Sequence, residues 1–215
     1  KAKKGTLQSS RLVCPENPTN TYAIADLRGD RRVNGETVYG LRMWENDDLV
    51  PRPDDVFQER LYCVRWTTPE GQRVYAAPDV DDLARETKAL KLVQANLAEW
   101  QAKGYLPCRP IPRGGDKTEE PIRTRGWTHW PHLFTPRQLF MLGSFIRHAV
   151  EPGPTDPLRV GAAAVGVGAA LERLSRLCGI DPHISKGPGS TMNVFFNQAL
   201  NTQMTYGSRR LEGIK

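Results

Sequence analysis

The sequence predicts an α+β fold, in which a β-rich N-terminal part built from a ribbon and hairpins precedes a mainly helical C-terminal part. Three observations predict this order. Runs rich in Tyr, Val, Trp and Thr, with partial alternation of apolar and polar residues, gather before residue 78. Apolar residues then recur at spacings of three, four and seven over 79–103. A complete helix-start signal stands at 135–138.

Residues 1–77 are expected to form a β-rich, ribbon-like unit. The runs that predict its strands are 21–27, 36–43, 60–67 and 72–77. A Pro-Glu-Gly turn separates the last two runs, which predicts a hairpin over 60–77 with a short loop. Between the strands, 28–35 reads as a turn-rich basic loop and 47–55 as a polar connector containing proline.

The segment 78–104 is predicted to be one long amphipathic helix. Aspartates in its first turn suit the positive N-terminal end, and Gly104 suits its C-terminal cap. The helix carries one apolar stripe, formed by Leu83, Leu90, Val93, Leu97 and Trp100. Such a stripe is either a core face or a seam that binds a partner.

The C-terminal half divides into a loop and a helical unit. Segment 105–126 is rich in Pro, Gly and Arg, and is predicted to be an exposed, mobile loop. Segment 127–215 is predicted to be helical. Its first helix begins at Thr135, which acts as the N-cap, with Pro136 at the first position and Gln138 completing a capping box.

Two more helices are predicted after the one that begins at Thr135. Pro152 ends that helix, and the next begins after Asp156 and ends before Gly179. The buried stripe expected on this second helix consists of Val160, Ala164, Val167, Leu171, Leu174 and Cys178. A third helix is predicted after Ser190.

Composition narrows the class of protein. The 215 residues carry a formal net charge of +6, with 39% hydrophobic and 25% charged residues, as in ordinary globular proteins. A basic balance favours anionic partners such as nucleic acid. Four scattered cysteines without a C-x-x-C pair predict reduced thiols in a cytoplasmic protein. The longest apolar run, 160–171, is too short to cross a bilayer, so no membrane partner is expected.

The motifs of enzymes and metal sites are weak or missing. There is no G-x-S-x-G, and the glycine-rich run 165–170 lies inside a helical pattern rather than after a strand. His129 and His132 lack a nearby third ligand, and Cys14 stands in C-P-E-N, which is half of a zinc knuckle. We therefore assign no catalytic, cofactor-binding or metal-binding residue to this chain.

The sequence favours nucleic-acid contact over catalysis or metal binding. The segment 104–150 contains seven basic residues and only three acidic ones. The candidate DNA-binding residues are Arg123, Arg125 and Arg137, because arginine grips phosphates. Arg137 could instead form a structural pair in the first turn of its helix.

The neighbouring aromatic residues and a second basic segment leave alternatives open. Trp127 and Trp130 either stack on exposed bases or fill the core. The loop R-G-D-R-R at 28–32 is a second basic candidate for phosphate contact.

Three sets of segments resemble one family. They are L-Y-C-V-R-W with R-V-Y-A-A-P-D-V-D-D-L (61–66 and 73–83), G-W-T-H-W-P-H-L-F-T-P-R-Q-L (126–139) and F-F-N-Q-A-L-N (195–201). In this order and spacing they resemble the middle of large prokaryotic adenine-specific DNA methylases with a zinc-ribbon insertion, some of which stand in phage-defence gene clusters. The most specific piece is L-F-T-P-R-Q-L. The resemblance extends over roughly residues 5 to 205, and is thin at 84–125.

The resemblance implies a parent protein that transfers methyl from S-adenosylmethionine to the adenine amino group of DNA. The family's cofactor-binding glycine motif lies upstream of this region and its D/N-P-P-Y motif downstream, so no catalytic or cofactor residue carries over. Where members show C-P-x-C, residues 14–17 read C-P-E-N, which indicates a degenerate zinc ribbon.

We therefore expect the chain to be an internal, non-catalytic piece of such a methylase that contacts DNA and the rest of the parent protein. The alternative is a protein–protein interaction scaffold. On that view, the 79–103 helix and the small-residue face of 157–178 dock onto a catalytic domain or a partner subunit.

Overall fold

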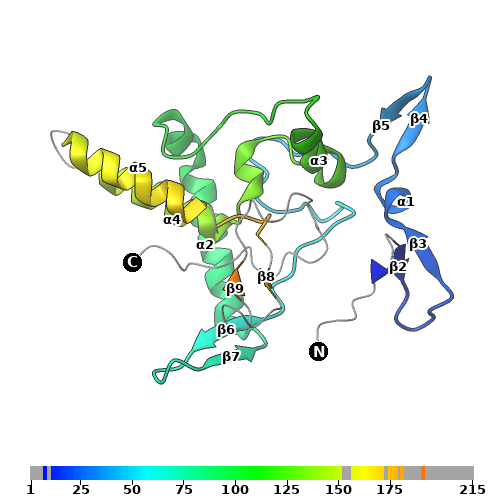
Figure 1. Ribbon diagram of the computed structural model, residues 1–215, viewed down its shortest axis with the longest axis horizontal. Helices are drawn as coiled ribbons and strands as arrows, with labels where there is room; N and C mark the ends of the chain where they lie inside the picture. The colour runs from blue at the N-terminus through cyan, green and yellow to red at the C-terminus, as the bar shows by residue number, and fades with distance from the viewer. Residues whose placement is uncertain are drawn as a thin grey trace.

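The computed structural model describes residues 7–8, 11–151, 156–171, 174–178, 180–181 and 190–191 (Figure 1). It confirms the α+β class: small antiparallel hairpins come first and helices follow. The strands are β1 (Leu7–Gln8), β2 (Arg11–Val13), β3 (Thr21–Ala23), β4 (Arg31–Val33), β5 (Glu36–Val38), β6 (Val64–Thr67), β7 (Arg73–Ala76), β8 (Ile180–Asp181) and β9 (Ser190–Thr191). The helices are α1 (Ile24–Arg28), α2 (Val80–Ala102), α3 (Asp116–Arg125), the 3-10 helix η1 (Trp130–Leu133), α4 (Pro136–Val150) and α5 (Pro157–Leu171).

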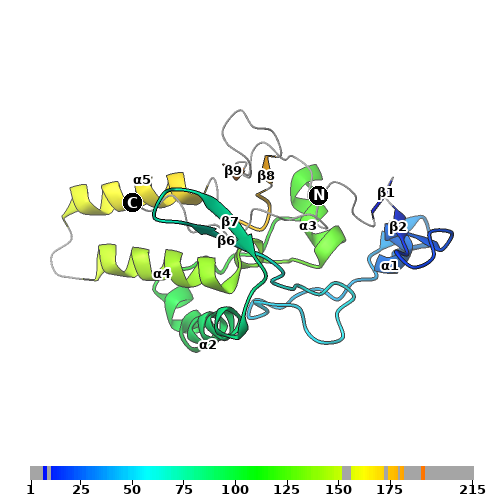
Figure 2. The same cartoon turned by 90° about the horizontal axis from the view of Figure 1, so that it is seen from below.

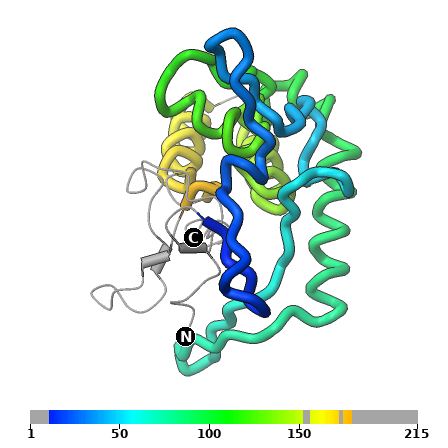
Figure 3. The backbone as a smooth tube through the Cα atoms, turned by 90° about the vertical axis from the view of Figure 1, so that its right-hand side faces the viewer, coloured from blue at the N-terminus to red at the C-terminus, as the bar shows by residue number. Residues whose placement is uncertain are grey.

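The blue segment that contains β2 to β5 lies on the side of the molecule that faces the viewer in Figure 3. β1, β2 and β3 make one antiparallel sheet, and β4 pairs with β5. The strand predicted over 21–27 ends at Ala23, where the chain turns into α1. The run 36–43 is a strand only as far as Val38.

The prediction of a plain loop over 28–35 was wrong, because β4 and β5 form a hairpin there. Asn34 and Gly35 join the strands with φ angles of 52° and 86°. Two successive positive φ angles are typical of the tight turn whose twist matches antiparallel strands, and Asn-Gly is its preferred sequence. The Asn-Gly pair was a stronger signal than the basic composition of the loop.

The hairpin predicted over 60–77 is confirmed by β6 and β7. Its register pairs Val64 with Ala76 and Trp66 with Val74. The loop between the strands closes where the amide of Thr68 donates to the carbonyl of Gln72, at 2.8 Å. In Figure 1 this ribbon projects below one end of α2, at the edge of the molecule.

The long predicted helix is confirmed as α2. Its N-cap Asp79 accepts a hydrogen bond from the amide of Asp82, whose carboxylate accepts one from the Asp79 amide in return. Val93, Leu97 and Trp100 are buried in the largest apolar cluster. The apolar stripe is therefore a core face over most of its length rather than a seam left open for a partner.

α4 lies between α2 and α5 and contacts both (Figure 2). The predicted capping box at its start is present: Thr135 accepts from the amide of Gln138, and the Gln138 side chain accepts from the Thr135 amide. α5 begins at Pro157 as predicted but ends at Leu171, earlier than expected. The third helix predicted after Ser190 lies outside the described residues. No described helix is long and apolar enough to cross a membrane.

The stripe predicted on the second helix is only partly right. Ala170 and Leu174 are buried with Leu142, and Val167 and Leu171 pack against them. Ala164, which was predicted to be in the stripe, is exposed. Val160 and Cys178 are also half-buried and buried, as predicted, whereas the buried Ala170 was not in the predicted stripe.

The expectation of an exposed, mobile loop over 105–126 was also wrong, because the segment contains α3. Acidic residues in its first turn and arginines in its last turn suit the helix dipole. Ile122 is buried in a second apolar cluster with Trp44, Ile111, Trp127 and Leu133. Gly126 ends the helix in the left-handed conformation. The chain before the helix is also anchored, because Tyr105 and Leu106 lie in the first cluster.

The close approach of α2 and α4 requires a glycine at position 143. A methyl group on Gly143 would overlap the ring of Trp100. We predict that Gly143→Ala lowers the free energy of unfolding by about 1–3 kcal/mol, because overpacking forces side chains or backbone to shift. Urea denaturation measures this. The control is Gly161→Ala in α5, where a methyl group meets no atom and the change is neutral or stabilising. Equal effects of the two substitutions would contradict the packing argument.

Candidate nucleic-acid interface

The three predicted DNA-binding arginines have different surroundings. Arg137, in the first turn of α4, donates through Nε to the Glu86 carboxylate of α2, at 2.7 Å. This pair joins two helices of the core. The alternative of a structural pair is therefore present at Arg137, and its charge already has a counter-ion.

Arg125 ends α3 and turns its guanidinium inward. The group lies 5.0 Å from the ring centre of Phe57 and 5.9 Å from that of Trp127. Burial lowers the pKa of Arg125 to about 10, an effect that neighbouring Glu59 opposes and Arg176 reinforces. Arg125 is therefore half-buried in a low-polarity setting.

Arg123 differs from the other two in its lack of a partner among the described residues. It is half-buried on α3, and the described part of the chain gives it no hydrogen bond or ion pair. Its charge also lowers the pKa of the Tyr39 hydroxyl slightly, against the larger effects of burial and the Glu119 bond, which raise it. The structure thus leaves Arg123 as a phosphate-contact candidate but does not gather the three arginines into one surface.

Of the aromatic residues after Arg125, Trp127 and His132 fill the core, whereas Trp130 is 37% exposed. Trp127 is only 4% exposed and meets Trp44 edge to face, with ring centres 6.2 Å apart. His132 is fully buried: Nδ1 accepts from the amides of Thr128 and His129, and Nε2 lies 2.9 Å from the carbonyl of Glu45. These rings are not available to stack on bases, and the core alternative holds for Trp127.

The described residues contain no group of three or more side chains that could hold a metal. Both ring nitrogens of His132 are occupied by the protein's own hydrogen bonds. Cys14 is a free thiol, as are the other three cysteines. A zinc site is therefore not assembled from the residues that the structure describes.

The exposed β6–β7 ribbon is a candidate surface to which sequence reasoning gave no function. Trp66 is 51% exposed and pairs across the ribbon with Val74, whereas Tyr75, 54% exposed, pairs with Arg65 on the opposite face. Arg73 lies on the same face as Tyr75. Aromatic rings interleaved with arginines on an exposed ribbon are what base stacking and phosphate contact require. In the sequence, the runs R-W at 65–66 and R-V-Y at 73–75 could have indicated this surface.

The β4–β5 hairpin offers a second basic ribbon. Arg31 and Arg32 are exposed on β4, opposite Val38 and Thr37 of β5. The basic candidate segment 28–32 is therefore ordered by strand pairing. Arg28 is half-buried and donates to the Asp30 carboxylate at 3.0 Å, so only part of the segment presents charge to a ligand.

No family model, curated protein or solved structure matches this chain.

The buried imidazole predicts how stability depends on pH. Burial lowers the pKa of His132 from 6.5 to about 4, so the folded protein binds fewer protons than the unfolded chain between these values. The free energy of unfolding should therefore be constant above pH 6.5 and fall below it, at roughly 1 kcal/mol per pH unit. Urea denaturation at pH 7.5, 6.5, 5.5 and 5.0 measures the slope.

The effect of His132 on stability can be separated from the effects of other titrating groups in that experiment. The pKa of the Asp55 carboxyl is lowered by its bonds to Arg42 and that of Asp48 by bonds from Arg42, the Glu45 amide and Arg52, so their protonation acts below this window. The exposed His148 provides a control, because His148→Gln should leave the slope unchanged. Stability that stays flat from pH 6.5 to 5.0 would contradict the account of His132.

Proposed function

We propose that this chain is a non-catalytic, DNA-contacting region of a cytoplasmic S-adenosylmethionine-dependent adenine-specific DNA methyltransferase. The β6–β7 ribbon carries the proposal for DNA contact, and the segments 61–66, 73–83 and 126–139 carry the resemblance to that family. In this proposal, methyl transfer and cofactor binding belong to other parts of the parent protein. The chain's own share is to hold or orient DNA.

The geometry of the ribbon favours nucleic acid over a neutral partner. A two-stranded ribbon fits the DNA major groove, and exposed aromatic rings stack on unpaired bases. Trp66 lies on one face of β6–β7, and Arg73 and Tyr75 lie on the other. One face can therefore meet bases while the other contributes positive charge. Arg31 and Arg32 of the β4–β5 hairpin, and Arg123 of α3, would add phosphate contacts outside the ribbon.

A test of this proposal is Trp66→Ala in the 215-residue chain, with binding to labelled single-stranded and duplex DNA followed over a salt series. Loss of a stacking ring should weaken binding about 5- to 100-fold and leave the salt slope unchanged, because no charge is removed. Tyr22→Ala is the matched control, since this exposed ring lies on β3 in a different sheet. The proposal is wrong if the wild-type chain shows no salt-sensitive binding, or if both variants behave alike.

A specific observation also favours the scaffold as a second candidate function. α5 exposes Leu158 and Val165, at 82% and 74%, on a helix that is apolar nearly all round. Helices of that kind are normally buried against a partner. The other face expected to dock, the stripe on α2, is largely used by the core. The scaffold proposal therefore rests on α5 alone, and the partner would be the catalytic domain or a sister subunit.

Val165→Glu tests this second candidate. A charge on the exposed face of α5 should weaken association with the remainder of the parent protein at least tenfold, measured by titrating the two separately expressed parts. Val80→Glu is the control, because Val80 is equally exposed, at 81%, but lies at the start of α2. Association that survives Val165→Glu would remove the scaffold proposal.

A further inference from the structure

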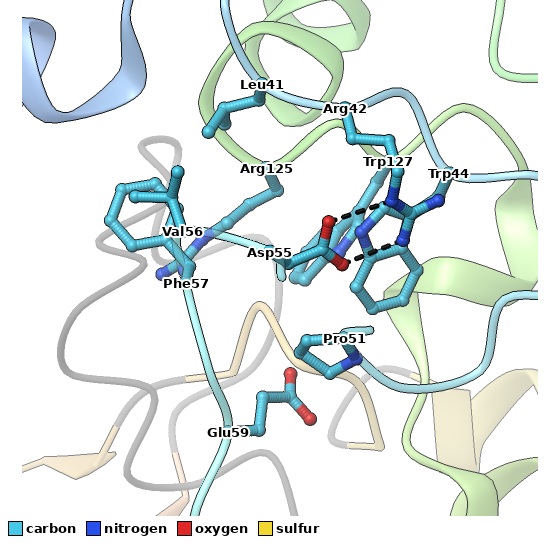
Figure 4. Close-up of a pocket in the computed structure, with 10 residues that line it drawn as sticks. All are labelled: Leu41, Arg42, Trp44, Pro51, Asp55, Val56, Phe57, Glu59, Arg125 and Trp127. Carbon is cyan, nitrogen blue, oxygen red and sulfur yellow. Dashed lines mark hydrogen bonds and ion pairs between the residues drawn. The ribbon is translucent and has the colours of Figure 1, made fainter. Parts of the chain in front are cut away.

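Arg125 lines a pocket in which the described residues offer its guanidinium no hydrogen bond (Figure 4). The apolar side of the pocket comes from Leu41, Val56 and Phe57, and Trp127 lies beyond the guanidinium. The Nε atom of Arg125 is buried without a hydrogen-bond partner among the described residues. Leaving a buried polar group unpaired costs free energy, and the cost is larger for a charged group.

The two carboxylates that line the pocket are already engaged. Asp55 accepts from Nε and Nη2 of Arg42, at 2.8 and 2.7 Å, and from the amide of Arg52. Glu59 forms an ion pair with Arg176, at 3.1 Å between Nε and Oε1. The Glu59 carboxylate therefore interacts electrostatically with two arginines, Arg125 and Arg176.

The guanidinium carbon of Arg125 lies 5.0 Å from the ring centre of Phe57 and 5.9 Å from that of Trp127. Such cation–π contacts stabilise the charge but give its N–H groups no oxygen acceptor. The N–H edge of a guanidinium carries donors arranged as a fork, which matches an oxyanion with two acceptor oxygens. The neighbouring carboxylates of Asp55 and Glu59 favour a single negative charge over two, because repulsion grows with ligand charge.

We propose that the Arg125 pocket binds one monoanionic oxyanion group, which Arg125 holds through its N–H edge. A phosphodiester of a nucleic-acid strand and a free small oxyanion share this chemistry. The inference stands apart from the β6–β7 ribbon, since the site can be tested without DNA. If a phosphodiester is the source, the pocket would fix one point of a strand while the ribbons contact others.

The test is a titration of the folded chain with sodium dimethyl phosphate or sodium acetate, against sodium chloride at matched ionic strength. The readouts are the thermal unfolding midpoint and the NMR signal of the Arg125 side-chain N–H. Both oxyanions should raise the midpoint above the chloride value and shift that signal. Arg125→Met should weaken binding about tenfold or more, as expected for a charge-assisted bidentate contact. Arg125→Lys keeps the charge without the fork and should also bind weakly.

Lys117→Met is the matched control, because it removes an exposed charge from the same helix and should leave the oxyanion effect intact. A short single-stranded oligonucleotide that displaces dimethyl phosphate would assign the site to nucleic acid, and one that does not would assign it to a free oxyanion. The inference is overturned if oxyanions act no more strongly than chloride, or if Lys117→Met abolishes the effect equally. Trp66→Ala should not alter dimethyl phosphate binding, so failure of the ribbon proposal and failure of the pocket are distinguishable.

Discussion

One buried guanidinium connects the parts of the structure that surround the pocket. The Arg176 side chain is 2% exposed, and it donates to the carbonyls of His132 and Leu49, at 2.7 and 2.8 Å. Its ion pair with Glu59 and its contacts with the rings of Trp44 and Trp127 complete its surroundings. Segments more than a hundred residues apart therefore meet at one charge. Removing such a group would leave buried carbonyls without donors, which costs more than the bonds themselves are worth.

The requirement that buried polar groups be paired also explains why an irregular segment can hold a fixed shape. Between α1 and α2, the chain over 41–58 has no helix or strand, yet Trp44 and Leu49 are buried. A network of charged side chains takes the place of regular hydrogen bonds. The Asp48 carboxylate accepts from the amide of Glu45, and Arg42 joins it to Asp55. Because Asp55 is paired with Arg42, and Glu59 with Arg176, neither carboxylate forms an ion pair with Arg125.

The sequence predicted the helices that are fixed by neighbouring residues. It did not predict those that depend on contacts with distant parts of the fold. The acidic first turn that begins at Asp79 and the capping box at Thr135 were sufficient to place the starts of α2 and α4, because each signal acts within four residues. α3 was missed because Pro121 and the flanking glycines indicate a loop. The helix persists since Ile122 is buried in a cluster that forms only when distant segments meet. The early end of α5 at Leu171 likewise cannot be predicted from its apolar periodicity.

Burial decides which basic residues can serve a ligand, and burial is what one sequence cannot give. The three candidate arginines look alike in the sequence but differ in the structure. Arg123 is a half-buried cation on α3, Arg125 is a desolvated cation in a pocket, and Arg137 forms an interhelical ion pair. By contrast, the ribbon of β6 and β7 was predicted with its strands and turn, and its alternation already places arginine and aromatic side chains at its surface. A strand pattern determines which residues share a face, because side chains alternate with period two. A helix end or a loop has no comparable rule. For that reason the ribbon is a candidate surface that the sequence could have identified, whereas the Arg125 pocket required the structure.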